Sequence, residues 1–128
     1  METTTLVGAG HLARPDAEAD LNALPWHAHP RFAGVALRHL VTGAETGGAL
    51  SAHLVRIEAG CCLESHVHEA SLELHEVAQG AGTCDLSGRQ VAYAPGVCGL
   101  IPAGTRHAVK ADAGGDLYIL AKFIPALL

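Results

Sequence analysis

From residue 34 onward, hydrophobic and polar positions alternate along short segments that are separated by Gly and Pro. In one such segment His53, Val55 and Ile57 share one side, and Arg56 and Glu58 share the other. This alternation predicts β-strands with one buried and one exposed face. Short strands at this spacing, bounded by turn residues, are typical of an all-β sandwich or barrel. Strands are expected at 35–41, 50–58, 63–68, 72–79, 81–86, 89–94, 97–101, 106–111 and 117–124.

The first 30 residues lack this alternation, so we expect an N-terminal extension over 1–30 and a barrel domain over 31–128. Residues 14–24 are compatible with a short helix, because Pro15 suits a first turn and acidic residues lie near the N-terminal end. Pro25 would end that helix. The predicted fold class is therefore all-β with a short N-terminal helical or irregular segment.

The stretch from Gly60 to Gly80 carries the strongest sign of chemistry, because His66 and His68 are followed by Glu73 at a short interval. On an extended strand, residues two apart point to the same side, so the two imidazoles share a face. Two imidazoles and a carboxylate from a neighbouring strand make a divalent-metal site in outline. The flanking glycines allow the turns that bring the second strand alongside.

A second stretch, residues 96–107, contributes His107 after a Pro-x-Gly turn. Together the two stretches resemble the two motifs of the cupin superfamily. The first matches G-x5-H-x-H-x4-E-x6-G at every fixed position, and the second matches G-x5-P-x-G-x2-H-x3-N except that Ala111 replaces the final asparagine. The resemblance implies a small single-domain cupin with a double-stranded β-helix, or jelly-roll, barrel. It also implies four metal ligands, which are His66, His68, Glu73 and His107.

The ligand set leaves the metal undetermined, because His and carboxylate ligands suit Fe, Mn, Ni, Co, Cu or Zn. A six-coordinate ion with four protein ligands keeps two positions open for a chelating substrate, or for a substrate atom and O2. A tetrahedral zinc would instead be saturated and structural. Burying three imidazoles and a carboxylate in a barrel without a shared cation is costly, which argues against four residues satisfied separately.

Two further histidines are candidate catalytic residues. His75 lies two positions after Glu73 and should share its inward face, where it would orient Glu73 or move a proton on a substrate. The alternative is a hydrogen-bonded core histidine. His53 would line the pocket if the face that it shares with Val55 points inward. Ala111, in place of an asparagine, predicts a more apolar pocket wall.

Three other features each have two interpretations. His27 and His29 form another H-x-H pair, either of solvated loop histidines or of contacts to a metal or pocket. The apolar residues 124–128 either pack on their own barrel or help cover a dimer face. Cys84 and Cys98 are expected to be small buried residues, unless a lowered thiol pKa gives them a redox role.

Composition narrows the classes of partner. A chain of 128 residues with 49% hydrophobic and 16% charged residues fits one globular domain. Its net charge of -5 and the lack of a basic cluster argue against nucleic acid or an anionic membrane as partner. No apolar run approaches the roughly 18 residues of a membrane span, and the start does not resemble a secretory signal. We therefore expect a cytoplasmic protein with reduced thiols.

Two classes of function follow from the resemblance. The first is a metal-dependent enzyme that acts on a small oxygen-bearing molecule, of dioxygenase or isomerase/lyase type, with the metal as Lewis acid or O2 binder. The second is a non-catalytic cupin that binds or senses a metal or a small molecule. Such cupins usually accompany a DNA-binding domain, for which this chain has no room. The resemblance also implies that a homodimer is the expected assembly.

Overall fold

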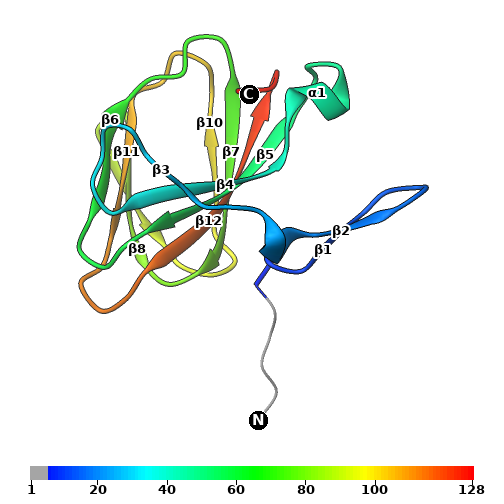
Figure 1. Cartoon of the computed structure of the whole chain (residues 1–128). Coiled ribbons are helices and arrows are strands. Elements are labelled where there is room, and N and C mark those ends of the chain that lie inside the picture. The colour runs from blue at the N-terminus through cyan, green and yellow to red at the C-terminus, as the bar shows by residue number, and fades with distance from the viewer. Residues whose placement is uncertain (1–5) are drawn as a thin grey trace.

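Two antiparallel sheets form the barrel in the computed structural model, which describes residues 6–128 (Figure 1). The larger sheet contains β3 (His27–Ala28), β4 (Val35–Val41), β5 (Ser51–Ile57), β7 (Leu72–Gln79), β10 (Cys98–Ile101) and β12 (Leu117–Ile124), in the order β10-β7-β12-β5-β4-β3. The smaller sheet contains β6 (Cys62–His66), β8 (Gly82–Leu86), β9 (Arg89–Tyr93) and β11 (His107–Ala111), in the order β6-β11-β8-β9. This is the all-β barrel that the alternation of the sequence predicts.

The strand boundaries agree closely with the hydrophobic pattern. β4, β7 and β12 occupy the predicted ranges, and the other predicted strands differ by one or two residues at one or both ends. The connection between β4 and β5 contains one turn of α-helix, α1 (Gly43–Thr46), which the left-handed Gly47 closes with a φ of 63°.

The N-terminal segment differs from the predicted helix over 14–24. β1 (His11–Ala13) and β2 (Glu18–Asp20) form a hairpin that extends away from the barrel (Figure 1). Only η1 (Leu21–Ala23), a turn of 3-10 helix, is helical, and the Asp20 side chain caps it by accepting a hydrogen bond from the backbone N–H of Asn22 at 2.9 Å. Pro15 lies in the connection of the hairpin, because its fixed φ suits a turn as well as a first helical turn.

The alternation along the strands separates two buried clusters. The main core fills the barrel between the sheets and includes Val55, Val109 and Phe123. The second cluster packs Leu54 on the other face of β5 against Leu21 of the N-terminal segment. Burial of one such side chain contributes about 1.5–3 kcal/mol, so the N-terminal segment is held to the barrel by its own apolar contacts.

The cysteines are all free. Cys84 is buried in the main core, as expected, and burial raises the pKa of its thiol, which disfavours a reactive thiolate. Cys98, which was expected to be buried, is exposed on β10, because its side chain points away from the barrel. Within residues 6–128 no helix has the length and apolar character needed to cross a membrane.

Candidate metal centre

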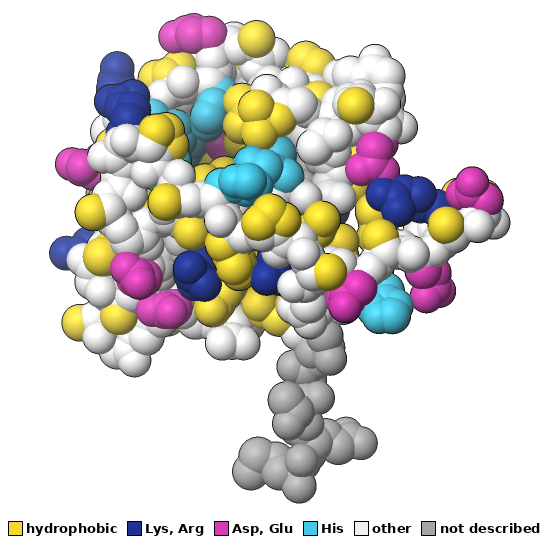
Figure 2. Space-filling model, viewed as in Figure 1, with side chains coloured by type: hydrophobic (Ala, Val, Ile, Leu, Met, Phe, Trp, Pro, Cys, Tyr) yellow, Lys and Arg dark blue, Asp and Glu magenta, His cyan; other side chains and the backbone are white. Residues whose placement is uncertain are grey.

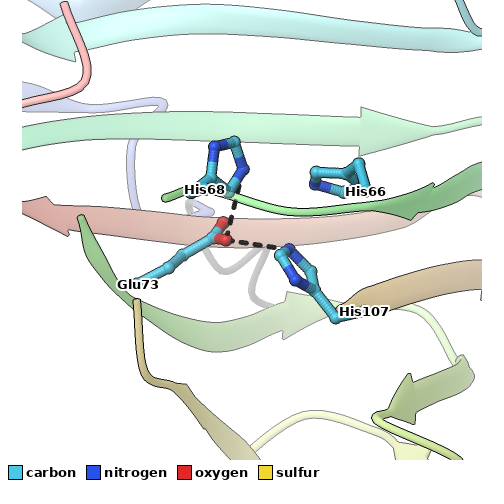
Figure 3. A group of neighbouring side chains, drawn as sticks. All are labelled: His66, His68, Glu73 and His107. Carbon is cyan, nitrogen blue, oxygen red and sulfur yellow. Dashed lines mark ion pairs between the residues drawn. The ribbon is translucent and has the colours of Figure 1, made fainter. Parts of the chain in front are cut away.

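The four side chains of the predicted ligand set come together between the two sheets (Figure 3). His66 ends β6 and lies opposite His107, the first residue of β11, in the antiparallel ladder. Glu73 reaches the same point from β7 of the larger sheet. His68 lies in the loop that follows β6. Its backbone carbonyl accepts a hydrogen bond from the N–H of Gly104 at 2.9 Å. One ligand atom from each of the four residues lies within 4.8 Å of the others.

Two buried atoms in this cluster have no hydrogen-bond partner, and they are the best evidence that the cluster fits a cation. Glu73 Oε1 and His107 Nε2 lie 3.1 Å apart, yet their orientation is not that of a hydrogen bond and neither has another partner. His68 Nε2 lies 3.7 Å from the same carboxylate oxygen. An unpaired buried polar atom costs roughly 1–3 kcal/mol. A shared cation would satisfy these atoms, and the donor set suits a divalent transition metal.

Backbone carbonyls orient two of the imidazoles. His66 Nδ1 lies 2.7 Å from the Glu64 carbonyl, and His107 Nδ1 lies 2.9 Å from the Thr105 carbonyl. Because a carbonyl only accepts, each Nδ1 carries the proton and donates. The lone pair of each neutral ring is therefore on Nε2, the nitrogen free to bind a metal.

Burial and charge set the protonation of the ligands. Burial lowers the pKa of His66 to about 4 and also lowers the pKa of His68, so both rings are neutral near pH 7. Burial would raise the pKa of Glu73, but His107 and His75 beside it hold that pKa well below its usual range. Burial would lower the pKa of His107, but the Glu73 carboxylate raises it. A bound cation would replace the proton that His107 and Glu73 attract.

His75 forms a hydrogen bond to the carboxylate of Glu73. Its Nε2 lies 2.8 Å from Glu73 Oε2, and its Nδ1 lies 2.9 Å from the hydroxyl of Tyr93. Since the carboxylate only accepts, His75 donates from Nε2 and accepts from Tyr93 at Nδ1 when it is neutral. The ring is 2% exposed. These contacts are compatible both with the orienting role and with the alternative of a hydrogen-bonded core histidine, and a catalytic role for His75 stays a prediction.

His53 points inward, as its strand face predicts, but lies behind an aromatic ring. Its Nδ1 lies 2.8 Å from His39 Nδ1, and its Nε2 lies 2.9 Å from Ser51 Oγ. The ring of Phe123 packs against His53 on one side and His68 on the other, with centroid distances of 5.6 Å and 5.0 Å. A catalytic role for His53 stays a prediction.

An inner cavity of about 90 Å³ opens beside three of the four ligands. On the face shown in Figure 2, histidines gather among hydrophobic side chains around a hollow. Ala111 is fully buried in the main core and does not line this cavity, so the apolar wall comes from other residues. The lining residues are His29, Val35, Leu37, Val55, Leu63, His66, His68, Glu73, Phe123 and Leu127.

His29 lines the inner cavity, although its H-x-H motif is equally compatible with a solvated loop histidine. Its Nδ1 accepts hydrogen bonds from the backbone N–H groups of Arg31 at 3.1 Å and Phe32 at 3.3 Å, so its proton is on Nε2. Burial, together with the charge of Arg31, lowers the pKa of His29. His27 instead stacks on His39 with ring centroids 4.9 Å apart. His29 therefore lines the inner cavity and His27 does not. The H-x-H spacing was the sequence feature that indicated such a contact.

Hydrogen bonds join the C-terminal residues to their own barrel. The N–H of Leu127 donates to Ser51 Oγ at 2.9 Å, and the Pro125 carbonyl accepts from Ser71 Oγ at 3.0 Å. The side chain of Leu127 lines the inner cavity. Ile124, Leu127 and Leu128 nevertheless keep more than a third of their surface exposed, so the interpretation that this segment helps to cover a dimer face stays open.

The buried His53 predicts acid sensitivity. Burial, with a smaller effect of His39, lowers its pKa from 6.5 to about 4. Between these values the unfolded chain takes up a proton that the folded chain excludes, so stability falls as the pH falls from 6.5 towards 4. This residue should contribute a loss of up to about 3 kcal/mol in the free energy of unfolding. Urea unfolding at pH 7, 5.5 and 4.5, with chelator present, should show a flatter pH dependence for His53→Gln than for wild type. Parallel curves would contradict the assignment.

The fold and the site together define a class of protein. It is a β-barrel in which three imidazoles and one carboxylate that could bind a metal converge between two sheets. The model of the cupin domain family Cupin_2 matches residues 53–122, more than half of the chain, and this chain therefore belongs to the cupin family. A search among curated proteins found no significant match.

Solved structures share the jelly-roll fold at low sequence identity. A predicted oxalate decarboxylase from Thermotoga maritima is 21% identical with a TM-score of 0.73, over 81% of this chain and 95% of that one. KdgF from Halomonas sp. is 24% identical with a TM-score of 0.68, over 79% and 86%. A sugar phosphate isomerase from Silicibacter pomeroyi is 20% identical with a TM-score of 0.70, over 82% and 73%. These similarities show the cupin fold.

Proposed function

We propose that this cupin is a metal-dependent enzyme that acts on a small oxygen-bearing molecule, of dioxygenase or isomerase/lyase type. The observation that carries the proposal is the pair of buried, unpartnered ligand atoms beside the inner cavity. A bound divalent transition metal would supply Lewis acidity toward a substrate oxygen. The residues that would hold it are His66, His68, Glu73 and His107.

The lining of the inner cavity favours a particular kind of molecule. Its walls are mainly Val, Leu and Phe side chains, which would surround an apolar body and exclude water. His29 offers an Nε2–H donor, and the lining residues within 6–128 include no Lys or Arg. These features favour a small chelate with one oxygen-bearing end, such as a diketone, a hydroxy acid or a catechol, over a molecule with several anionic groups.

The structural relatives support an enzyme of this kind. Two of them are described as a predicted oxalate decarboxylase and a sugar phosphate isomerase, and the substrates in these names are small oxygen-bearing molecules. The negative net charge supports the proposal that neither nucleic acid nor a membrane is a partner. We also propose a cytoplasmic homodimer, and light scattering on the purified protein would test the assembly.

A second candidate is a cupin that binds or senses a metal or a small molecule without turnover. The observation that favours it is the position of the candidate catalytic residues, because neither His75 nor His53 lines the inner cavity. Among the described residues, His29 is the one titratable group that lines the cavity and does not belong to the ligand set.

Metal analysis followed by ligand binding would test these candidates. Protein purified without chelator should carry about one divalent transition metal per chain, and acetylacetone, lactate and catechol should be tested for binding by calorimetry and for conversion by product analysis with an oxygen electrode. Binding with metal-dependent conversion supports the enzyme, and binding without conversion supports the second candidate. Failure to bind any divalent transition metal would overturn the enzyme, and failure to bind either a metal or any of the three molecules would overturn the second candidate as well.

His29→Ala gives a prediction on the same assay. Loss of one hydrogen bond to the chelate should weaken its binding roughly 2- to 10-fold while the metal content stays at the wild-type level. His27→Ala is the matched control, because His27 belongs to the same H-x-H pair but does not line the cavity. Equal chelate affinities in the two variants would show that His29 does not contact the bound molecule.

A further inference from the structure

Two arginines and the single tryptophan form a stacked group on the outer face of the larger sheet. Arg38 of β4 pairs with Leu54, and Arg56 of β5 pairs with Ala36, so the two arginines are diagonal neighbours on one face. Each guanidinium carbon lies 4.5 Å from the centroid of the Trp26 ring. In Figure 2, basic side chains flank hydrophobic ones on the lower part of the barrel, near the N-terminal segment.

Among residues 6–128, neither guanidinium has an ion-pair partner. Arg38 is only 7% exposed, and its side chain makes one hydrogen bond, from Nη1 to Asn22 Oδ1 at 3.3 Å. Its Nε is buried without a partner. Burying a cation beside a like charge is unfavourable, and stacking on an indole compensates only part of that cost. The group therefore lacks an anion.

The same group lines a cavity of about 250 Å³, which we call the outer cavity. Its polar lining consists of Arg38, Arg56, Asn22, Gln79 and Tyr118, beside the Trp26 ring. The outer cavity is separate from the inner one because successive strand residues face opposite ways. Leu37 and Val55, which precede Arg38 and Arg56 in the sequence, accordingly line the inner cavity instead.

We propose that the outer cavity is a second binding site, which holds the carboxylate or phosphate group of a small metabolite between Arg38 and Arg56. Guanidinium groups bind both oxyanions through paired, charge-assisted hydrogen bonds. The Arg38 guanidinium makes one hydrogen bond, to Asn22, so most of its N–H donors have no partner in the described residues. The side-chain amides of Asn22 and Gln79 and the hydroxyl of Tyr118 supply neutral donors around the same space. Because Arg38 is almost completely buried, a small anion reaches it more readily than an acidic side chain of a second copy.

The chain itself provides the reporter for this site. Trp26 is its only tryptophan and contacts both arginines, so its emission reports on an anion bound there. Inorganic phosphate and, separately, acetate should be titrated into the full chain at constant ionic strength, balanced with sodium chloride. We expect a saturable change in emission with a dissociation constant on the order of 1 mM for the preferred anion. The stronger of the two responses identifies a phosphate or a carboxylate as the favoured group.

Variants separate a site from general salt effects. Arg56→Gln should weaken the response at least about tenfold, because one charged donor group is removed. Arg38→Gln should weaken the response by a similar factor if the variant folds. If it does not fold, Arg56→Gln still tests the proposal, because Arg56 is partly exposed. Arg89→Gln, on the exposed part of β9, should respond like wild type. His66→Ala should also respond like wild type, so the result does not depend on the metal centre.

Three results would overturn the proposal. The first is a response that stays linear for both anions. The second is an equal affinity in wild type and Arg56→Gln. The third is a response that follows dissociation of a dimer by light scattering, because the arginines would then bind acidic groups of a second copy.

Discussion

His66→Ala and Glu73→Ala are each expected to reduce the bound metal to less than about a tenth of the wild-type content. Each variant removes one of four converging donors, and Glu73 is the only anionic one. Loss of one ligand costs more than the 1.4 kcal/mol that corresponds to a tenfold change in affinity. The measurement is metal per chain by mass spectrometry after purification without chelator and extensive dialysis.

Folding must be tested in parallel, because an unfolded chain would also lose its metal. Far-UV circular dichroism and a cooperative thermal transition should show that both variants keep the barrel. His11→Ala is the matched control, since His11 lies on the exposed N-terminal hairpin and pairs with Glu18 there. It should retain the wild-type metal content. Full occupancy in both ligand variants would refute the site.

Gly80→Ala is expected to destabilise the fold by more than about 3 kcal/mol, since two separate costs add at this position. Gly80 follows β7 with a φ of 87°, a conformation that L-residues rarely adopt. A Cβ there would lie 2.2 Å from the carbonyl oxygen of Asp116 and 3.0 Å from Cα of Leu117. These are backbone atoms at the start of β12, so relief requires the β7–β12 pair to separate. Urea unfolding followed by circular dichroism measures the loss.

Gly60 provides a control from the same sequence motif. Its φ is 74°, but nothing lies within 4 Å of the position of a Cβ. Gly60→Ala should therefore lower the free energy of unfolding only by the cost of the backbone conformation, about 1–2 kcal/mol. Equal losses for the two glycines would show that the contact with β12 relaxes without cost.

The strands could be predicted because strand periodicity is a local property. Along β5, His53, Val55 and Ile57 alternate with Leu54 and Arg56, and the structure places the two sets on opposite faces of the sheet. A period of two requires only that neighbouring residues meet different environments. The strand boundaries therefore followed from the sequence to within one or two residues.

The N-terminal hairpin could not be predicted in the same way. Pro15 and the acidic residues after it are compatible with both a helix start and a turn, and their local preference is weak. Contacts with distant parts of the chain stabilise the observed structure. Arg14 forms an ion pair with Glu45 of α1, and Leu21 packs on Leu54 of β5.

The sequence by itself determined the β-strands, because alternation is a property of short segments, and its resemblance to the cupin motifs implied the barrel and the four side chains that converge in it. Only the tertiary structure decided what surrounds those ligands. Tyr93 reaches His75 from the opposite sheet, Phe123 separates His53 from His68, and Trp26 lies over two arginines of β4 and β5. Each of these contacts joins residues at least 12 positions apart, and which residues meet at such distances depends on how strands pair and sheets pack.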